Sequence, residues 1–249
     1  MLNHPPMLIT AVAALAVGLS ACAGGSGVAA KSSSATGAST PTITPTTTSP
    51  TTPLAGTRTT VEVRAALLAL DDLPSGFAIE PAGASGDAGA AKSADPKCGA
   101  LVKLMNAKKA PGSKASASAS LSGGQDGPFI DESIDALASA DAVAALQTSF
   151  KTAVAACRQL TVSIPGQGSS TMKVVEVSAP KFGDHTLAAR LTASGGPLDG
   201  LEITQVIAGV QDVVLSITFV AAFPEDVDGG TEAAVAKAED VLGGASPGA

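Results

Sequence analysis

The chain has 249 residues, enough for one or two domains with a sizeable core. Its 22 acidic residues outnumber its 15 Lys and Arg residues, so the formal charge is −7, which argues against nucleic acid as a partner. Hydrophobic residues make up 45% of the chain but aromatic ones only 2%, and the absence of Trp and Tyr argues against stacking on sugars or bases.

Residues 1–21 have the pattern of a secretory signal peptide. The apolar run 8–21 is too short to span a bilayer, and it ends in Leu19-Ser20-Ala21-Cys22, which resembles a bacterial lipobox. We therefore expect Cys22 to be lipidated, so that acyl chains hold the protein at the extracytoplasmic face of the cell membrane. One departure from the pattern is that residues 1–7 contain neither Lys nor Arg. The alternative is an ordinary signal with a coincidental Cys.

The next segment, to residue 57, is rich in Gly, Ser, Ala, Thr and Pro, and residues 40–53 are mostly Thr and Pro. Such a segment cannot bury enough apolar surface to fold, and its prolines favour extended conformers. We therefore expect a lipidated Cys and a disordered stalk over 22–57, with a reach of about 100 Å. A single domain is expected over 58–243, followed by a disordered tail over 244–249.

Within the domain, apolar stripes at helical spacing and N-cap residues predict helices, whereas alternating or β-branched runs predict strands. The expected helices span residues 60–70, 96–107, 139–157 and 231–242. The expected strands lie within residues 77–80, 114–121, 128–136, 172–178, 186–192, 200–208 and 213–223. Loops are expected at 82–94 and 163–170. The order predicts an α+β fold, an antiparallel sheet of about five to six strands with helices packed on one face.

Cys98 and Cys157 remain once Cys22 carries lipid, and both fall on stripes that we expect to face inward. Outside the membrane an even pair of Cys residues indicates a structural disulfide, so we expect one disulfide between them. The alternatives are a metal site or a redox-active pair. A metal site would need two more ligands, and the chain after the signal has one His and no Cys-x-x-Cys motif.

Several short features now stand together: the lipobox, the Thr/Pro stalk, Leu73-Pro74-Ser75-Gly76 after the first helix, two Cys flanking a strand pair and a helix, and Phe182-Gly183-Asp184-His185-Thr186. Over residues 61–242 this order resembles the secreted sensor-domain family of actinobacteria, which includes the extracellular domain of the PknH-type kinase. The kinase domain has two disulfides, whereas one is available here. The resemblance implies an α+β domain with a cleft that binds an envelope ligand and no established catalytic residues.

The residues give no catalytic constellation. His185 and Asp184 are adjacent in an expected turn, where neighbouring side chains point apart, so an exposed His is the simpler interpretation. The Gly-x-Ser-x-Gly match at 244–248 lies in the tail with no helix after it, so it is no nucleophile elbow. We predict that the protein is no enzyme and has no cofactor and no metal.

Two charged groups each leave two interpretations open. The acidic group fits a Ca²⁺ site or, since the ligand pattern of a calcium loop is missing, an acidic entry to a helix; it comprises Glu225, Asp226, Asp228 and Glu232. The basic run fits a surface for anionic lipid headgroups or wall polymers, or more simply a solvated face; it comprises Lys97, Lys103, Lys108, Lys109 and Lys114.

We therefore predict a lipid-anchored, non-catalytic cell-envelope protein whose extracytoplasmic domain binds or senses a ligand. The Ala/Val-rich interior predicts an apolar groove between helices and sheet. Candidate ligands are a small molecule, a lipid or a wall polymer. The alternative is an interaction or scaffolding lipoprotein that presents a surface to another envelope protein. A hydrolase is the weakest reading, because His185 is the one conventional base.

Overall fold

The structure is a computed structural model that describes residues 58–80, 89–125 and 127–243. Cys22, the stalk, the tail with its Gly-x-Ser-x-Gly match, and part of the expected loop at 82–94 lie outside the described residues. The sheet is antiparallel throughout, in the order β1-β3-β4-β9-β8-β7-β6-β5-β2. Its strands are β1 (Ala78–Ile79), β2 (Ala90–Lys92), β3 (Ala115–Ser122), β4 (Phe129–Ala136), β5 (Gln159–Ile164), β6 (Gly168–Val177), β7 (Asp184–Ser194), β8 (Glu202–Val210) and β9 (Val213–Val220). The helices are α1 (Thr60–Ala65), α2 (Gly99–Met105), α3 (Ala140–Ala156) and α4 (Pro224–Gly243), with 3-10 turns η1 (Leu70–Asp72) and η2 (Pro96–Cys98).

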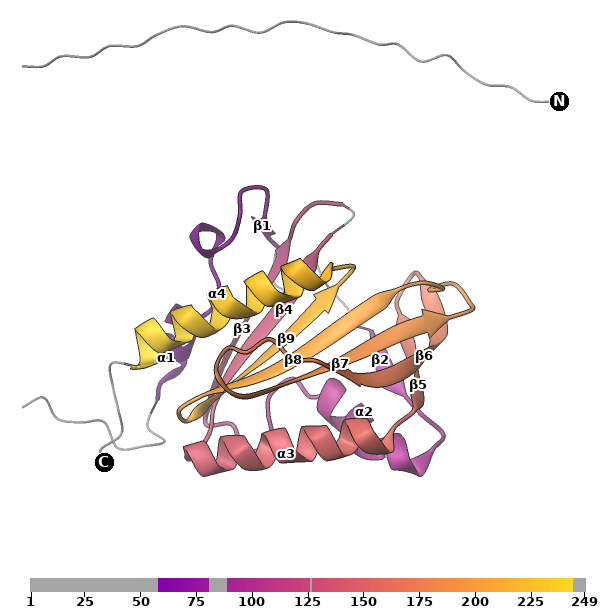
Figure 1. The fold of residues 1–249 in the computed structure, drawn as a ribbon, viewed down its shortest axis with the longest axis horizontal. Coiled ribbons are helices and arrows are strands. Elements are labelled where there is room, and N and C mark those ends of the chain that lie inside the picture. Colours follow the sequence, from indigo (N-terminus) through magenta and orange to yellow (C-terminus); the bar gives the residue numbers. More distant parts are fainter. Residues whose placement is uncertain (1–57, 81–88, 126, 244–249) are drawn as a thin grey trace, which may run out of the picture. The chain divides into compact units, whose positions relative to one another are not determined.

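Helices cover both faces of the sheet (Figure 1). On one face, α1 packs on β3 and β4 while α4 packs on β8 and β9. On the other face, α3 packs on β6 to β9, and α2 packs on α3 and β2. Each layer has its own apolar cluster, the first around Leu215, Ile217 and Phe219 and the second around Phe150 and Met172.

The sequence prediction of an α+β fold with an antiparallel sheet is confirmed, but the expected strand number and the single helical face are wrong. In the central strand β9, consecutive residues Val213, Val214 and Leu215 are all fully buried. Such an unbroken apolar run is typical of a strand covered on both sides, and it was the available sign of a second helical layer.

Two strands were missed, and only the first of them has a weak sequence signal, since β5 (Gln-Leu-Thr-Val-Ser-Ile) alternates apolar and polar residues. β2 consists of Ala-Ala-Lys, which has no β-branched residue, and it exists through pairing with β5, some seventy positions along the chain. β5 precedes a tight turn and pairs with β6, so the segment expected as a loop at 163–170 holds the end of one strand and the start of the next.

The last helix begins at Pro224, seven positions before the predicted start. Gly229 and Gly230 hid its first two turns, since glycine disfavours a helix interior. Gly230 is required there by packing: a Cβ at this position would lie 2.7 Å from Cε1 of Phe219, which is fully buried. The glycine therefore lets α4 approach the sheet more closely than any other residue would allow.

The first helix is shorter than expected and ends at Ala65. Thr59 caps it in a reciprocal capping box with Glu62. Beyond the helix the backbone leaves helical geometry, and the N–H of Leu68 donates to a side chain of the sheet, Glu132, over 2.7 Å. None of the helices in the described part of the chain is long and apolar enough to cross a membrane.

Candidate functional site

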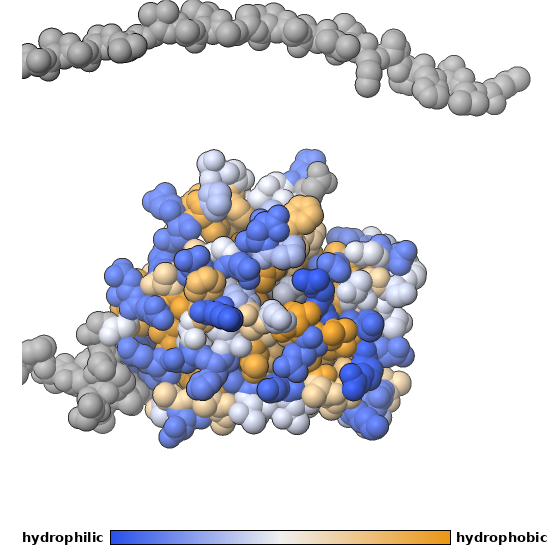
Figure 2. Space-filling view, viewed as in Figure 1, coloured by the Kyte–Doolittle hydropathy of each residue, from blue (hydrophilic) through white to orange (hydrophobic). Residues whose placement is uncertain are grey.

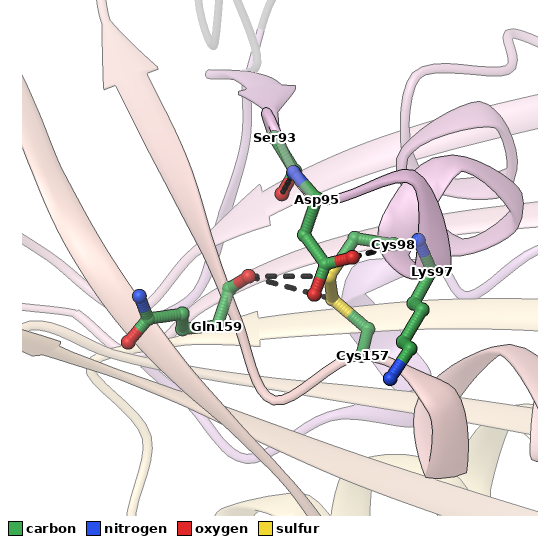
Figure 3. The surroundings of a disulfide bond; sticks show 6 residues. All are labelled: Ser93, Asp95, Lys97, Cys98, Cys157 and Gln159. Atoms are coloured by element: carbon green, nitrogen blue, oxygen red, sulfur yellow. Dashed lines mark hydrogen bonds between the residues drawn. A yellow bond between two sulfur atoms is a disulfide. The ribbon is translucent and has the colours of Figure 1, made fainter.

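Cys98 and Cys157 form a disulfide, as the sequence predicted, and both are fully buried in the second apolar cluster. The bond ties η2 and α2 to the end of α3. Figure 3 shows the carbonyl oxygen of Gln159 directed at the sulfur pair, 3.2 Å from Cys98 Sγ. Asp95 begins η2 by accepting a hydrogen bond from the N–H of Lys97 over 2.9 Å. Buried sulfur beside a capped helix start is typical of a structural crosslink.

The sequence predicted a turn at His185, but this residue lies at the start of β7. The pairing of β7 with β8 shifts register between Asp184 and Leu187, and His185 has a φ of 49°. This is a bulge, at which His185 is exposed. Its neighbour Asp184 uses its carbonyl oxygen to accept a hydrogen bond from Gln147 of α3 over 2.7 Å. No hydrogen bond or ion pair joins the side chain of His185 to an acid or a nucleophile among the described residues.

The predicted acidic group falls on the first half of α4. Glu225 and Asp226 lie in the first turn, where carboxylates complement the helix dipole. Asp226 also accepts a hydrogen bond from the N–H of Phe223 over 2.9 Å, which caps the helix. In the described part of the chain no His, Cys, Asp and Glu residues are grouped as a metal site would require.

The predicted basic run does not form one surface element. Its members are exposed, and they are spread over η2, α2 and the connection to β3: Lys97, Lys103, Lys108, Lys109 and Lys114. The interpretation as a solvated face fits this placement, since each side chain is free to reach water.

The predicted apolar groove is not formed by the described residues. A shallow hollow among the described residues lies between α3 and strands β6 and β7, beside Phe150, Val154 and Leu187, and it has no room for a water molecule. Small side chains let the layers come into direct contact. Gly209 of β8 illustrates this, because a Cβ there would lie 3.0 Å from Val143 Cγ1 of α3. Figure 2 shows hydrophobic residues only in small areas among hydrophilic ones on the face in view.

A cationic area lies where neither α4 nor α1 covers the sheet. Along β6 and β7, Met172, Val174 and Leu191 point toward α3, so the residues between them point to the opposite face. That face carries Lys173 and Arg190, and the pairing with β5 and β2 adds Lys92. We call this surface the cationic face; it comprises Lys92, Thr161, Thr171, Lys173, Arg190 and Thr192.

The polar atoms of the cationic face are only partly satisfied. Lys92 and Lys173 are exposed, and Nε of Arg190 is buried without a hydrogen-bond partner among the described residues. Glu202 lies at its margin, where it accepts a long hydrogen bond from Thr192 (3.4 Å). Cations beside threonine hydroxyls can bind an anionic group through charge-assisted hydrogen bonds.

A second unusual site is buried beneath α1 and α4. Glu132 points from β4 into the first apolar layer with 2% of its surface exposed. One carboxylate oxygen, Oε2, accepts from Leu68 N–H, and the other, Oε1, has no partner among the described residues. Burial raises the pKa of Glu132 to about 7, although the Leu68 hydrogen bond and the charge of Lys237 act in the opposite direction.

An ion pair lies beside this carboxyl group. Lys237 of α4 binds Oδ2 of Asp72, which also accepts from the N–H of Ala69 over 2.7 Å. Burial by itself would raise the pKa of Asp72, but the hydrogen bonds from Lys237 and Ala69 outweigh it, so that pKa is lowered. The three charged groups join β4, η1 and α4, which are far apart in sequence.

Comparisons with known proteins identify a fold and no family. No family and no curated protein matches the sequence. Among solved structures, the extracellular domain of PknH from Mycobacterium tuberculosis matches with a TM-score of 0.52 and 14% identity, over 75% of this chain and 97% of that chain. The chain therefore has the fold of that extracellular domain, which agrees with the resemblance found in the sequence.

Sequence reasoning found the disulfide but not the cationic face or the buried carboxyl group. Lys173 and Arg190 are 17 positions apart, and only the β6–β7 register places them on one face. Glu132 stands in the alternating run Phe-Ile-Asp-Glu-Ser-Ile, where Ile130 and Ile134 are buried on its own face. That period-two pattern was the signal that could have placed the glutamate inside.

Proposed function

We propose that this protein is a lipid-anchored, non-catalytic domain on the extracytoplasmic side of the cell membrane that binds an envelope ligand. The observation that carries the proposal is the fold shared with an extracellular domain over 97% of that domain's length. The lipobox ending in Cys22 and the buried Cys98–Cys157 bond support the same compartment, because disulfides persist in oxidising surroundings.

We infer further that the ligand is anionic and binds on the cationic face. The hollow between α3 and strands β6 and β7 has no room even for a water molecule, so an exposed surface is the better candidate for recognition. Lys173 and Arg190 lie diagonally across neighbouring strands, close enough for both to reach one anionic group. Arg190 as a whole is half-buried, and the planar guanidinium group of an arginine is suited to binding an anionic group.

The alternative is an interaction or scaffolding lipoprotein that presents a surface to another envelope protein. The hollow beside α3, which has no room for a water molecule, favours this alternative over a small-molecule ligand at that place. An acidic protein surface would complement the cationic face as well as a polymer does. The two readings differ in what crosslinks to this face in cells: a single protein species, or polymer and lipid.

Binding is tested on the full chain carrying Cys22→Ala, which removes the acyl chains as a separate source of membrane affinity. The probes are vesicles of phosphatidylcholine with or without phosphatidylglycerol, and soluble anionic wall polymer from the host. We expect salt-sensitive binding to an anionic probe, weakened at least tenfold by Lys173→Gln with Arg190→Gln. Lys151→Gln, an exposed cation on α3, is the matched control. Equal binding by all three proteins would refute the cationic face as the site.

Lipid anchoring is tested by fractionation of cells that express the full chain or Cys22→Ala. We expect the wild-type chain in the membrane fraction and the variant in the soluble or secreted fraction. Membrane retention of Cys22→Ala would contradict the anchor without bearing on the ligand.

A further inference from the structure

The segment 58–73 lies against the domain as a continuous strip between the N-terminal part of the chain and β1. Its first residue, Arg58, is an anchor. Its Nε donates to Oδ1 of Asp212 over 2.6 Å, its Nη2 donates to Oε1 of Gln211 over 3.0 Å, and its Nη1 donates to the carbonyl oxygen of Leu242 over 3.2 Å. These partners lie in the β8–β9 turn and at the end of α4. We call residues 58–73 the strap.

The strap is held again near its far end by the buried charges described above. Leu68 N–H donates to Glu132, and Asp72 binds Lys237 of α4. Between the two anchored ends the strap buries apolar side chains against β3, β4 and α4; they are Val63, Ala66, Leu67 and Leu68. Its attachment therefore depends on side-chain packing and a few ionic contacts.

The strap has little structure that could stand on its own. α1 has six residues, and a helix this short is marginal in water without packing. The backbone hydrogen bonds of residues 59–73 are local, joining residues at most four positions apart, whereas the strands pair along much of their length. Segments of this kind open at lower free energy than the core.

We propose that the strap is a releasable unit, able to leave the sheet while the rest of the domain stays folded, and that the charge on Glu132 controls its release. With the strap in place, Glu132 is shielded from water and Oε1 has no partner. Removing the strap takes Leu68 and the neighbouring residues away and admits water to the carboxyl group. The ionised form gains most from hydration, so ionisation favours the open strap.

The groups that face Glu132 are few. Lys237 reaches it from α4 and favours the ionised form, whereas Asp72 reaches it from η1 and disfavours it. The residues directly opposite on the neighbouring strands are Ala119 of β3 and Ile217 of β9, which carry no charge. The charged side chains of α1 are exposed. The coupling therefore runs through one carboxyl group and one adjacent ion pair.

The size of the coupling follows from linkage. With the strap docked, the pKa of Glu132 is about 7, and a carboxyl group in water has its ordinary pKa of 4.5. These two values predict that opening becomes about tenfold more favourable between pH 6 and pH 8. Opening uncovers the apolar side of β3 and β4, which gives a change in pH a route to a binding partner.

Hydrogen exchange on the full chain tests the strap directly. Protection factors, which correct for the intrinsic pH dependence of exchange, are measured at pH 6 and pH 8 for peptides covering 60–70 and for peptides from β8 and β9. We expect the strap peptides to lose about tenfold in protection at pH 8 while the β8 and β9 peptides keep theirs. Strap and sheet losing protection together would overturn the proposal.

Three variants separate charge from structure. Glu132→Gln keeps an acceptor for Leu68 but cannot ionise, so its strap protection should be the same at both pH values. Glu176→Gln, at an exposed position of β6, should behave as the wild type does. Asp72→Asn breaks the ion pair with Lys237, so it should lower strap protection at both pH values and retain a pH response. A pH response of wild-type size in Glu132→Gln would refute the assigned carboxyl group. If that variant does not fold, Asp72→Asn still decides. Unchanged strap protection in Asp72→Asn would refute the claim that the ion pair with Lys237 holds the strap.

Discussion

Removing the disulfide should cost the domain a large part of its stability. Cys98 and Cys157 are separated by 59 positions, and closing a loop of this length restricts the unfolded chain by about 4 kcal/mol in the chain-entropy model. A small domain typically has about 5–15 kcal/mol in total. The double variant Cys98→Ala with Cys157→Ala should therefore remain folded only marginally at 25 °C.

The assay is urea unfolding of the full chain, followed by circular dichroism because the protein has no Trp. Linear extrapolation gives the free energy of unfolding, and the slope reports whether the unfolded state has expanded. Cys22→Ala is the control, since it removes the thiol that lies outside the closed loop. We expect a loss of about 4 kcal/mol in the double variant and none in the control.

The loss of stability should begin in a particular part of the domain. The bond joins η2 and α2 to the end of α3, so residues 89–106 should lose protection from hydrogen exchange before β8 and β9 do. A double variant within about 1 kcal/mol of the wild type would refute the reasoning, because the crosslink would then constrain little of the unfolded chain.

Three further predictions concern the first helical layer. The raised pKa of Glu132 means that the folded state holds the proton of this carboxyl group more tightly than the unfolded state does. The free energy of unfolding should therefore fall by about 3 kcal/mol as the pH rises from 4.5 to about 7, and level off above. Urea titrations of Glu132→Gln should show no such dependence on pH. Gly229→Ala, which meets open space, should raise the melting temperature through about 1 kcal/mol of helix propensity, whereas Gly230→Ala should lower it by forcing a Cβ against a buried ring at 2.7 Å. Arg58→Ala should cost about 3 kcal/mol by leaving the carboxylate of Asp212, 3% exposed, without its partner, and Asp212→Asn in the same chain should recover part of the loss.

Local patterns in the sequence predicted the elements that depend on local signals. The helix after Ser139 was predicted because Ser139 caps it and Val143, Phe150 and Val154 recur on its buried side. The disulfide was predicted because two Cys residues fell on inward stripes in a chain that we expected to lie outside the membrane. The helix can be read from spacing alone, whereas the disulfide also needed the expected compartment and the even number of remaining Cys residues.

The rest depends on pairing between distant segments. β2 is a strand because β5 lies beside it, and Gly230 is tolerated inside α4 because Phe219 packs beneath it. The cationic face exists because β6 and β7 bring Lys173 and Arg190 to one side of the sheet. The sequence carried no local signal for any of these contacts, and they include the groups on which the functional proposals depend.

Intact mass spectrometry of the protein extracted from the membranes of its own host, alkylated without reduction, tests the central claim most directly. If the protein is lipid-anchored and disulfide-bonded, we expect one species that begins at Cys22 and carries diacylglycerol. This species takes up no alkylating reagent at Cys98 or Cys157. An unacylated chain with both of these thiols alkylated would contradict the account.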